Sequence, residues 1–186
     1  MRDIGADLAQ AGIVLHGIEP NTSCPPGSAS IAAACGPWHG RVDIAVRRDD
    51  PDFTRAINAA WLRQATNFRL FAENGQFLLL ANLEEDRWED PDSRWLRVSL
   101  GDDWNLAGPA VGGVVGPSRD GLFTMSLDGE VIIEGTTYEE ESSVLAVPQP
   151  YRAEPFRAWT RHLIDEWKRN GEDTRWAEAW LARASD

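Results

Sequence analysis

Two short turn signals constrain this chain more than any other feature of its sequence. Asn74-Gly75 and Asp128-Gly129 each stand between two apolar runs. A two-residue turn of this kind needs positive φ at its central residues, which Asn, Asp and Gly adopt readily, and it joins neighbouring antiparallel strands. The sequence therefore predicts two β-hairpins, formed by Phe68–Ala72 with Phe77–Leu83 and by Leu122–Leu127 with Val131–Thr137.

Further strands are expected around these hairpins. Arg41–Val46 places Val42, Ile44 and Val46 on one side, which is the alternation of a half-buried strand. Trp95–Leu100 is predicted as a strand, and Ser143–Val147 as a short strand that stops at Pro148. The apolar, glycine-rich stretch Leu106–Gly116 fits either an irregular strand or a packed loop. We expect residues 68–147 to form one mostly antiparallel sheet.

Two long helices flank this sheet in the sequence. Asp50-Pro51 combines an N-cap residue with a proline at the first helical position, which predicts a helix over 51–65. A second helix is predicted over 155–169, because its apolar residues share one broad face and Asn170-Gly171 follows as a stop signal. A short C-terminal helix should follow. We expect helices 51–65 and 155–169 to pack on one face of the sheet.

The order of these elements predicts an α+β fold in a single domain over residues 1–186. A short opening helix is expected at Asp3–Ala11. The segment 17–40 is rich in Gly, Pro and Ser, so we expect it to be mostly loop, with one helical turn at Ile31–Cys35.

Charge is distributed unevenly along the chain. The formal net charge is −12, and residues 64–148 hold 16 acidic and 5 basic residues, net −11, while the flanking parts are close to balance. A nucleic-acid-binding surface needs basic residues, so this composition argues against nucleic acid and favours a basic protein partner. The apolar runs are too short to span a membrane, and residues 1–15 do not resemble a signal peptide, so we expect a cytoplasmic protein.

Two acidic runs, at 84–92 and 139–141, dominate that central segment. Trp88 lies inside the first run, and a tryptophan among charges is typical of an interaction hot spot with a charged rim. A solvated acidic face without a partner is the alternative interpretation. The candidate partner-binding residues are Glu84, Glu85, Asp86, Trp88, Glu89, Asp90, Asp92, Glu139, Glu140 and Glu141.

Patterns for catalysis or metal binding are sparse. Cys24, Cys35 and His39 lack the close ligand pair that structural zinc sites use, so we expect two reduced thiols and no metal. In a small enzyme the catalytic groups would be Cys35 with His39, or a carboxylate pair such as Asp102 and Asp103. No catalytic residue and no cofactor is assigned from the sequence.

The Asn74-Gly75 and Asp128-Gly129 hairpins, the two acidic runs and the helix with Phe156, Trp159 and Trp167 together resemble the small acidic immunity proteins paired with bacterial polymorphic toxins. The resemblance lies in composition and architecture rather than in a motif. It implies a non-enzymatic α+β protein that blocks a cognate toxin, often a nuclease with a basic cleft. A phage-encoded inhibitor that mimics the charge of DNA, such as an anti-CRISPR or anti-restriction protein, is the alternative.

Overall fold

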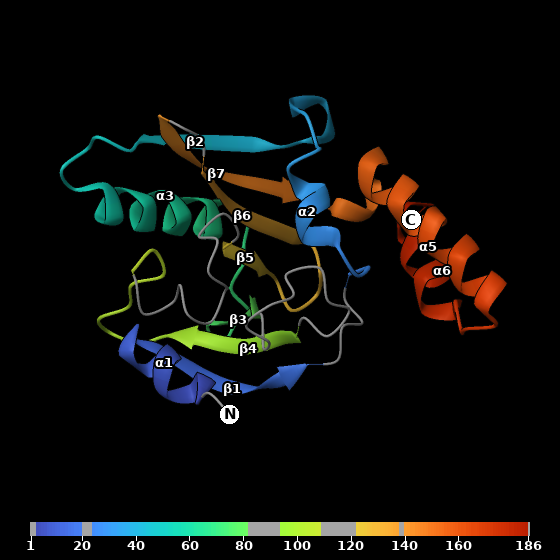
Figure 1. Cartoon of the computed structure of the whole chain (residues 1–186), viewed down its shortest axis with the longest axis horizontal. Coiled ribbons are helices and arrows are strands. Elements are labelled where there is room, and N and C mark those ends of the chain that lie inside the picture. The colour runs from blue at the N-terminus through green and yellow to red at the C-terminus, as the bar shows by residue number, and fades with distance from the viewer. Residues whose placement is uncertain (1–2, 20–23, 82–93, 109–121, 138–139, 186) are drawn as a thin grey trace.

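The computed structural model describes residues 3–19, 24–81, 94–108, 122–137 and 140–185 (Figure 1). Its helices are α1 (Ile4–Gln10), α2 (Ser28–Ala32), α3 (Phe53–Asn67), α5 (Glu154–Asn170) and α6 (Arg175–Ala182), with short 3-10 turns η1 (Pro37–His39), η2 (Pro150–Arg152) and η3 (Arg183–Ser185). Its strands are β1 (Ile13–Glu19), β2 (Val42–Arg47), β3 (Gln76–Ala81), β4 (Arg94–Leu100), β5 (Leu122–Met125), β6 (Val131–Thr137) and β7 (Glu141–Pro148).

The seven described strands form one sheet in the order β1-β4-β3-β5-β6-β7-β2, and every neighbouring pair is antiparallel. The predicted α+β class with an antiparallel sheet is confirmed. The sheet is wider than the predicted 68–147, because β1 and β2 come from the first 47 residues and add its two outer strands.

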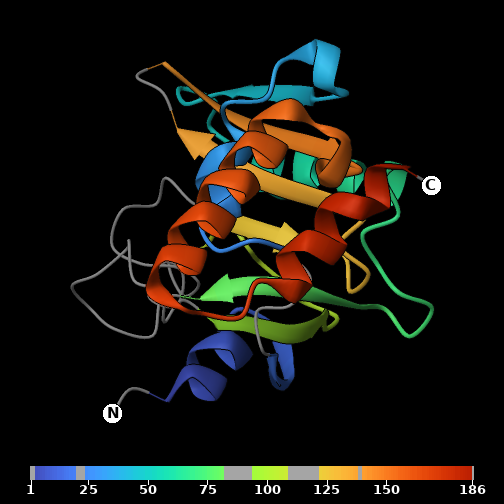
Figure 2. The same cartoon turned by 90° about the vertical axis from the view of Figure 1, so that its right-hand side faces the viewer.

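The helices cover both faces of this sheet, so the prediction that 51–65 and 155–169 share one face is wrong. One face, here called the α3 face, packs against α1 and α3; the other, called the α5 face, packs against α2, α5 and α6. Figure 2 shows α5 and α6 in front of the strands and α3 behind them. The physical reason is alternation along the strands: Leu78 and Leu79 are both buried but point to opposite faces, so each face needs its own cover.

The α3 face holds an aromatic cluster. Trp61 of α3 is fully buried, and its ring centroid lies 5.9 Å from Phe71, 5.4 Å from Phe77 and 5.7 Å from Trp104. Its indole Nε1–H donates to the hydroxyl of Thr124 at 3.1 Å. Because the one polar atom of the indole is satisfied, the whole side chain is buried without an unpaired donor.

The first predicted hairpin is wrong in one of its two strands. Phe68–Ala72 does not form a strand; it closes the end of α3, where Arg69 has a φ of 56° and the amide of Leu70 donates to Ala65 O at 2.8 Å. The turn at Asn74-Gly75 exists, with Gly75 at φ 75°, but β3 pairs with β4 and β5 instead. The second hairpin is confirmed: β5 and β6 pair across Asp128-Gly129.

Segment 17–40 also differs from its prediction. Residues 17–19 belong to β1, a strand that the sequence interpretation missed, and the helical turn is α2, which begins earlier than the predicted Ile31–Cys35. Two glycines conceal the strand: Gly12 precedes it, and Gly17 lies at a β-bulge that interrupts its alternation. The two long helices begin within one or two residues of their predicted starts: α3 begins at Phe53 instead of 51, and α5 at Glu154 instead of 155. Before α3, the carboxylate of Asp50 accepts a hydrogen bond from the amide of Asp52 at 2.8 Å.

Candidate functional site

Most of the predicted partner-binding residues lie outside the described residues. This applies to Glu84, Glu85, Asp86, Trp88, Glu89, Asp90 and Asp92 of the first acidic run, and to Glu139 of the second. Glu140 and Glu141 are described, and both side chains are exposed at the start of β7. Trp95, which flanks the first run, is buried in the α5-face core, as its strand position predicts.

The strand ends that flank the two acidic runs lie at the same end of the sheet. Ala81, which precedes the first run, pairs with Arg94, which follows it. Thr137, which precedes the second run, pairs with Ser142. β3 and β6 both run antiparallel to β5 and therefore run in the same direction, so they end at the same end of the sheet. We call this end of the sheet the acidic end. β2 also ends there, and Arg48 and the acidic residues Asp49 and Asp50 follow it directly in the sequence.

The strands themselves carry few of the charges. Eight of the 16 acidic residues in 64–148 belong to the part of the chain that the structure describes, and of these eight only Glu134 and Glu141 lie in a strand. The described strands are filled mostly by apolar side chains that the two cores need, which leaves few positions for acidic residues. Among the described residues, most of the acidic side chains of 64–148 therefore lie outside the strands.

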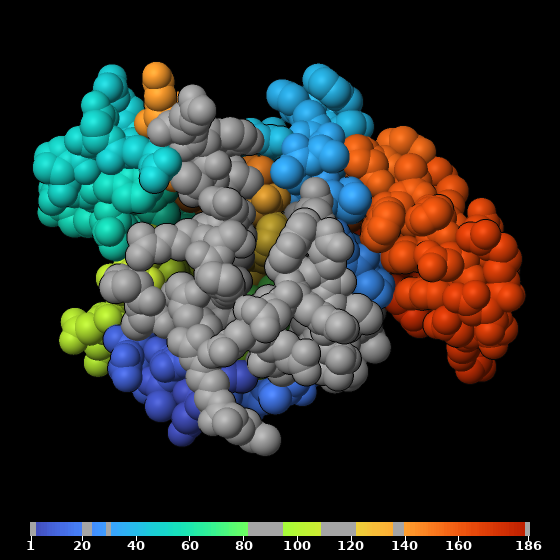
Figure 3. All heavy atoms as spheres, in the orientation of Figure 1, coloured from blue at the N-terminus to red at the C-terminus, as the bar shows by residue number. Residues whose placement is uncertain are grey.

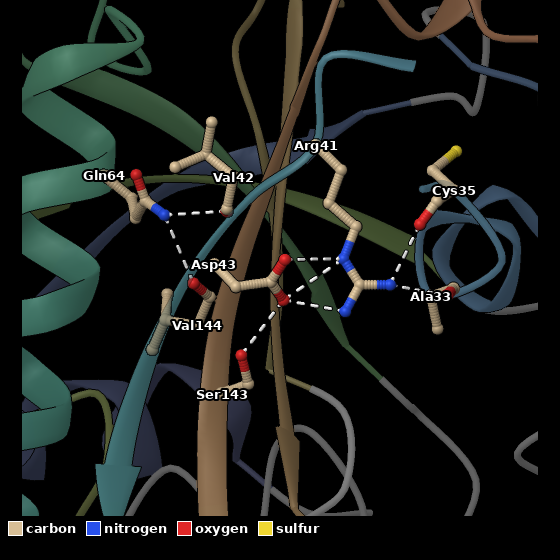
Figure 4. A network of polar contacts seen from close by, with 8 residues as sticks. All are labelled: Ala33, Cys35, Arg41, Val42, Asp43, Gln64, Ser143 and Val144. Carbon is tan, nitrogen blue, oxygen red and sulfur yellow. Dashed lines mark hydrogen bonds and ion pairs between the residues drawn. The ribbon is translucent and has the colours of Figure 1, made fainter. Parts of the chain in front are cut away.

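A polar network on the α5 face joins α2 to the sheet (Figure 4). The guanidinium of Arg41 donates through Nε and Nη2 to the carboxylate of Asp43 at 2.7–3.1 Å, and through Nη1 to the carbonyls of Ala33 at 2.7 Å and Cys35 at 3.0 Å. The hydroxyl of Ser143 donates to the same carboxylate at 3.1 Å. Arg41 therefore fastens the end of α2 and the segment after it to β2 and β7.

Glu134 lies in the middle of this face and was not singled out from the sequence. Its side chain is only 3% exposed, and its Oε2 has no hydrogen-bond partner among the described residues. Burial raises the pKa of this carboxyl to about 8, although the charge of Arg41 and a hydrogen bond from the backbone of Ala33 act in the opposite direction. A single acid inside the otherwise apolar and neutral run Val131–Thr137 was the signal that could have identified it.

The geometry gives no support for a reactive Cys35–His39 pair. The thiol of Cys35 donates to Ile31 O at 3.8 Å, and burial raises its pKa to about 11. Nδ1 of His39 accepts a hydrogen bond from the amide of Gly36 at 3.0 Å, so this nitrogen is engaged by the backbone. A nucleophilic cysteine needs a lowered pKa, and the environment here favours the neutral thiol instead.

Both cysteines are free thiols in the structure and both are buried. The thiol of Cys24 is completely buried, and burial raises its pKa to about 12. Within the described residues, no three His, Cys, Asp or Glu side chains are grouped so that they could hold a metal ion.

Trp38 is an exposed aromatic that the sequence interpretation did not propose as a contact residue. It lies in η1 and is 82% exposed, the largest value among the large apolar residues that the structure describes. η1 precedes the start of β2, so Trp38 lies toward the opposite end of that strand from the acidic end. An exposed tryptophan is a common anchor in protein interfaces.

Comparison with known proteins identifies no relative: no family model matches the chain, and no curated protein or solved structure matches it. None of the described helices is both long and apolar enough to cross a membrane.

Proposed function

We propose that this protein is a non-enzymatic binding protein that neutralises a basic protein partner, in the manner of an immunity protein that blocks a toxin. One observation carries the proposal: the two densest acidic runs lie in the sequence between strand ends that meet at the same end of the sheet, and six of the eight described acidic residues of 64–148 lie outside the strands. Like charges in one region repel each other and destabilise the folded state, and a partner with basic charge compensates for that cost.

The two kinds of residue in the acidic runs have different roles in this proposal. Charged side chains at a rim act over about one Debye length, ~8 Å at physiological salt, so they mainly raise the association rate. An aromatic side chain that becomes desolvated acts at short range and mainly slows dissociation. Glu140 and Glu141 fit the first role because both are exposed, and Trp88 is assigned the second.

The proposal is tested by growth rescue. The product of the gene adjacent to this one in its source genome is expressed in a bacterial host with and without the protein. Wild-type protein should relieve the growth inhibition, and a variant with Glu139, Glu140 and Glu141 changed to Lys should relieve it poorly. The matched control changes Asp165, Glu166 and Glu172, exposed acids of the α5 segment, to Lys and should rescue as well as the wild type. Inhibition that the wild-type protein does not relieve contradicts the proposal.

Binding kinetics of the triple Lys variant and of Trp88→Ala distinguish an effect on the association rate from an effect on the dissociation rate. Measured by surface plasmon resonance against the purified toxin at several salt concentrations, the triple Lys variant should associate more slowly and with a flatter salt dependence. Trp88→Ala should leave association unchanged and raise the dissociation rate about 30-fold, the equivalent of ~2 kcal/mol for a hot-spot residue. Binding that does not depend on salt and survives both changes would place the interface elsewhere.

A further inference from the structure

The outer edge of β2 carries backbone groups that the sheet does not use. β2 is the last strand of the sheet on its side, and its other edge pairs with β7. Just past the end of β2, the backbone amide of Arg48 donates to Glu140 O at 3.0 Å. The backbone N–H of Arg48 therefore points toward β7 rather than outward. Because successive residues of a strand alternate in direction, Val46, Ile44 and Val42 also face β7, whereas Arg47, Ala45 and Asp43 direct their N–H and C=O groups outward.

Gln64 supports this assignment from the α3 face. Its side-chain amide donates to the carbonyls of Val42 at 2.9 Å and Val144 at 3.3 Å, which places both oxygens between β2 and β7. Of the outward groups, Arg47 O accepts from the amide of Asp50 at 3.3 Å within the turn. No described backbone group pairs with the outward N–H and C=O of Ala45.

One antiparallel register makes this edge complementary to itself. With Ala45 opposite Ala45 of a second copy, the two alanines exchange both of their backbone hydrogen bonds, and each Arg47 amide faces the carbonyl of the other Asp43. The same register sets the side chain of Asp43 opposite that of Arg47 on both sides of the axis. On the α3 face it sets Ile44 opposite Val46, also twice.

The side chains around this edge are accessible for such contacts. Arg47 has 80% of its side chain exposed and Asp43 keeps 36% exposed. A shallow groove of about 500 Å³, lined by Val46, Pro51 and Ala56 among others, lies beside β2 at the start of α3. In the register described above, Ile44 of the second copy lies opposite Val46, which is one of the residues that line this groove.

The other edge of the sheet is less suited to pairing. β1 exposes Val14 and Ile18, but its register shifts between Leu15 and Gly17. A bulge bends a strand and interrupts the regular spacing of its backbone groups, which is one way in which proteins protect an open edge. β2 pairs with β7 without any such shift.

We propose that β2 pairs antiparallel with β2 of a second copy of this chain, about a two-fold axis at Ala45, and joins the two sheets into one. This inference does not depend on the proposed function. Because the two strands run in opposite directions, the acidic ends of the two copies point away from each other, so pairing leaves both of them open.

The first test is Ala45→Pro, examined by sedimentation velocity over a wide range of protein concentrations. The Ala45 amide points outward, so proline there leaves the β2–β7 hydrogen bonds in place while it removes a donor from the proposed pairing. The wild-type chain should associate to dimers and the variant should stay monomeric with an unchanged circular dichroism spectrum. A wild-type chain that is monomeric at millimolar concentration, or a folded variant that dimerises equally well, overturns the proposal.

A second pair of variants decides the question even where proline disturbs folding. Arg47→Glu replaces both attractive pairs with Asp43 by repulsive ones and should weaken dimerisation roughly tenfold. Arg55→Glu makes the same charge change at a different exposed arginine, which forms an ion pair with Asp52 of its own chain. This control variant should leave dimerisation unchanged. Equal effects of the two changes would show that net charge alone is responsible and would contradict the proposed register.

Cross-linking tests the register directly. Hydrogen-bonded antiparallel partners have Cα atoms about 5.5 Å apart, which lies within the range that a disulfide spans. Ala45→Cys should therefore form a covalent dimer on mild oxidation. Val42→Cys, at an exposed position of the same strand that does not oppose itself, should not. Equal cross-linking at both positions would contradict the register.

Discussion

The two faces of the sheet are covered in different ways. On the α3 face, Trp61 packs against Phe71, Phe77 and Trp104. The side-chain nitrogen of the buried Gln64 donates to backbone carbonyls of β2 and β7. On the α5 face the cover includes the five-residue helix α2, which Arg41 fastens to the sheet. Glu134 lies beneath α2, and its Oε2 has no partner within the part of the chain that the structure describes.

The two faces should therefore differ in how their contributions to the stability of the fold depend on pH. Burial of large apolar surface depends little on pH, so the α3 face should be equally firm over a broad pH range. The α5 face contains a buried carboxyl and two buried thiols, whose stability contribution depends on their protonation.

Trp61→Ala should have the largest effect. It removes the centre of the aromatic cluster and leaves Thr124 without the indole donor, which should lower the free energy of unfolding by about 3–5 kcal/mol. Urea unfolding followed by circular dichroism gives the value. Trp38→Ala is the matched control, because this side chain is 82% exposed and its loss should change the free energy of unfolding by less than about 0.5 kcal/mol. Equal losses in the two variants would contradict the assignment of the core.

Arg41→Met should have the second-largest effect. The change leaves Asp43 without its ion-pair partner and the carbonyls of Ala33 and Cys35 without the guanidinium donor. We expect the free energy of unfolding to fall by about 2 kcal/mol, less than for a fully buried pair because Asp43 is partly exposed. Arg175→Met is the control: Arg175 also pairs with an aspartate two residues away, but both side chains are exposed, so stability should hardly change. If the two variants unfold alike, Arg41 does not fasten α2.

Glu134→Gln should change the pH dependence of stability. Below the ordinary glutamate pKa of 4.5 the folded and unfolded chains both hold the proton, and between 4.5 and about 8 only the folded chain does. The wild-type free energy of unfolding should therefore fall as pH rises through this window, by up to about 1.4 kcal/mol per pH unit from this group. Glu134→Gln should lose that component, whereas Glu141→Gln, an exposed change on β7, should retain it. Equal slopes in all three proteins would contradict a buried neutral Glu134.

The thiols should give the smallest effect, seen in a rate rather than in stability. Burial raises the pKa of Cys24 to about 12 and that of Cys35 to about 11, so neither forms much thiolate at neutral pH. Ellman's reagent should react slowly with the folded protein and rapidly after denaturation. In Arg41→Met, the release of the Cys35 carbonyl should speed the reaction of Cys35 selectively, as mass spectrometry of the labelled peptides would detect. Immediate labelling of both thiols in the folded wild-type protein would contradict their burial.

Local patterns predicted most of the strands and helices but not their arrangement. The Asp128-Gly129 turn and the Gly171 stop depend on backbone geometry that a few adjacent residues determine. An amphipathic pattern shows which side of a helix is apolar, but not which face of a sheet it covers, so α3 and α5 were wrongly placed together. Phe68–Ala72 has the apolar content of a strand, and the turn at Arg69 that ends α3 prevents it from forming one.

The candidate site was predictable to a smaller extent. The acidic runs were evident from charge alone, whereas the Arg41 network joins residues from β2, β7 and the end of α2, up to about 100 positions apart, and no local pattern links them. Glu134 could have been identified as an unusual acid in an apolar strand, but its raised pKa depends on α2 packing over it.

The strand order also has a consequence for how the chain is made. β1 pairs only with β4, where His16 and Ser99 are 83 positions apart, and β2 pairs within the chain only with β7, where Asp43 and Ser143 are 100 apart. At a synthesis rate of about 5–20 residues per second, the ribosome needs roughly 5–20 s to supply the partner of β2. β2 therefore emerges from the ribosome long before the strand that it pairs with, and the completion of the fold awaits the synthesis of β7.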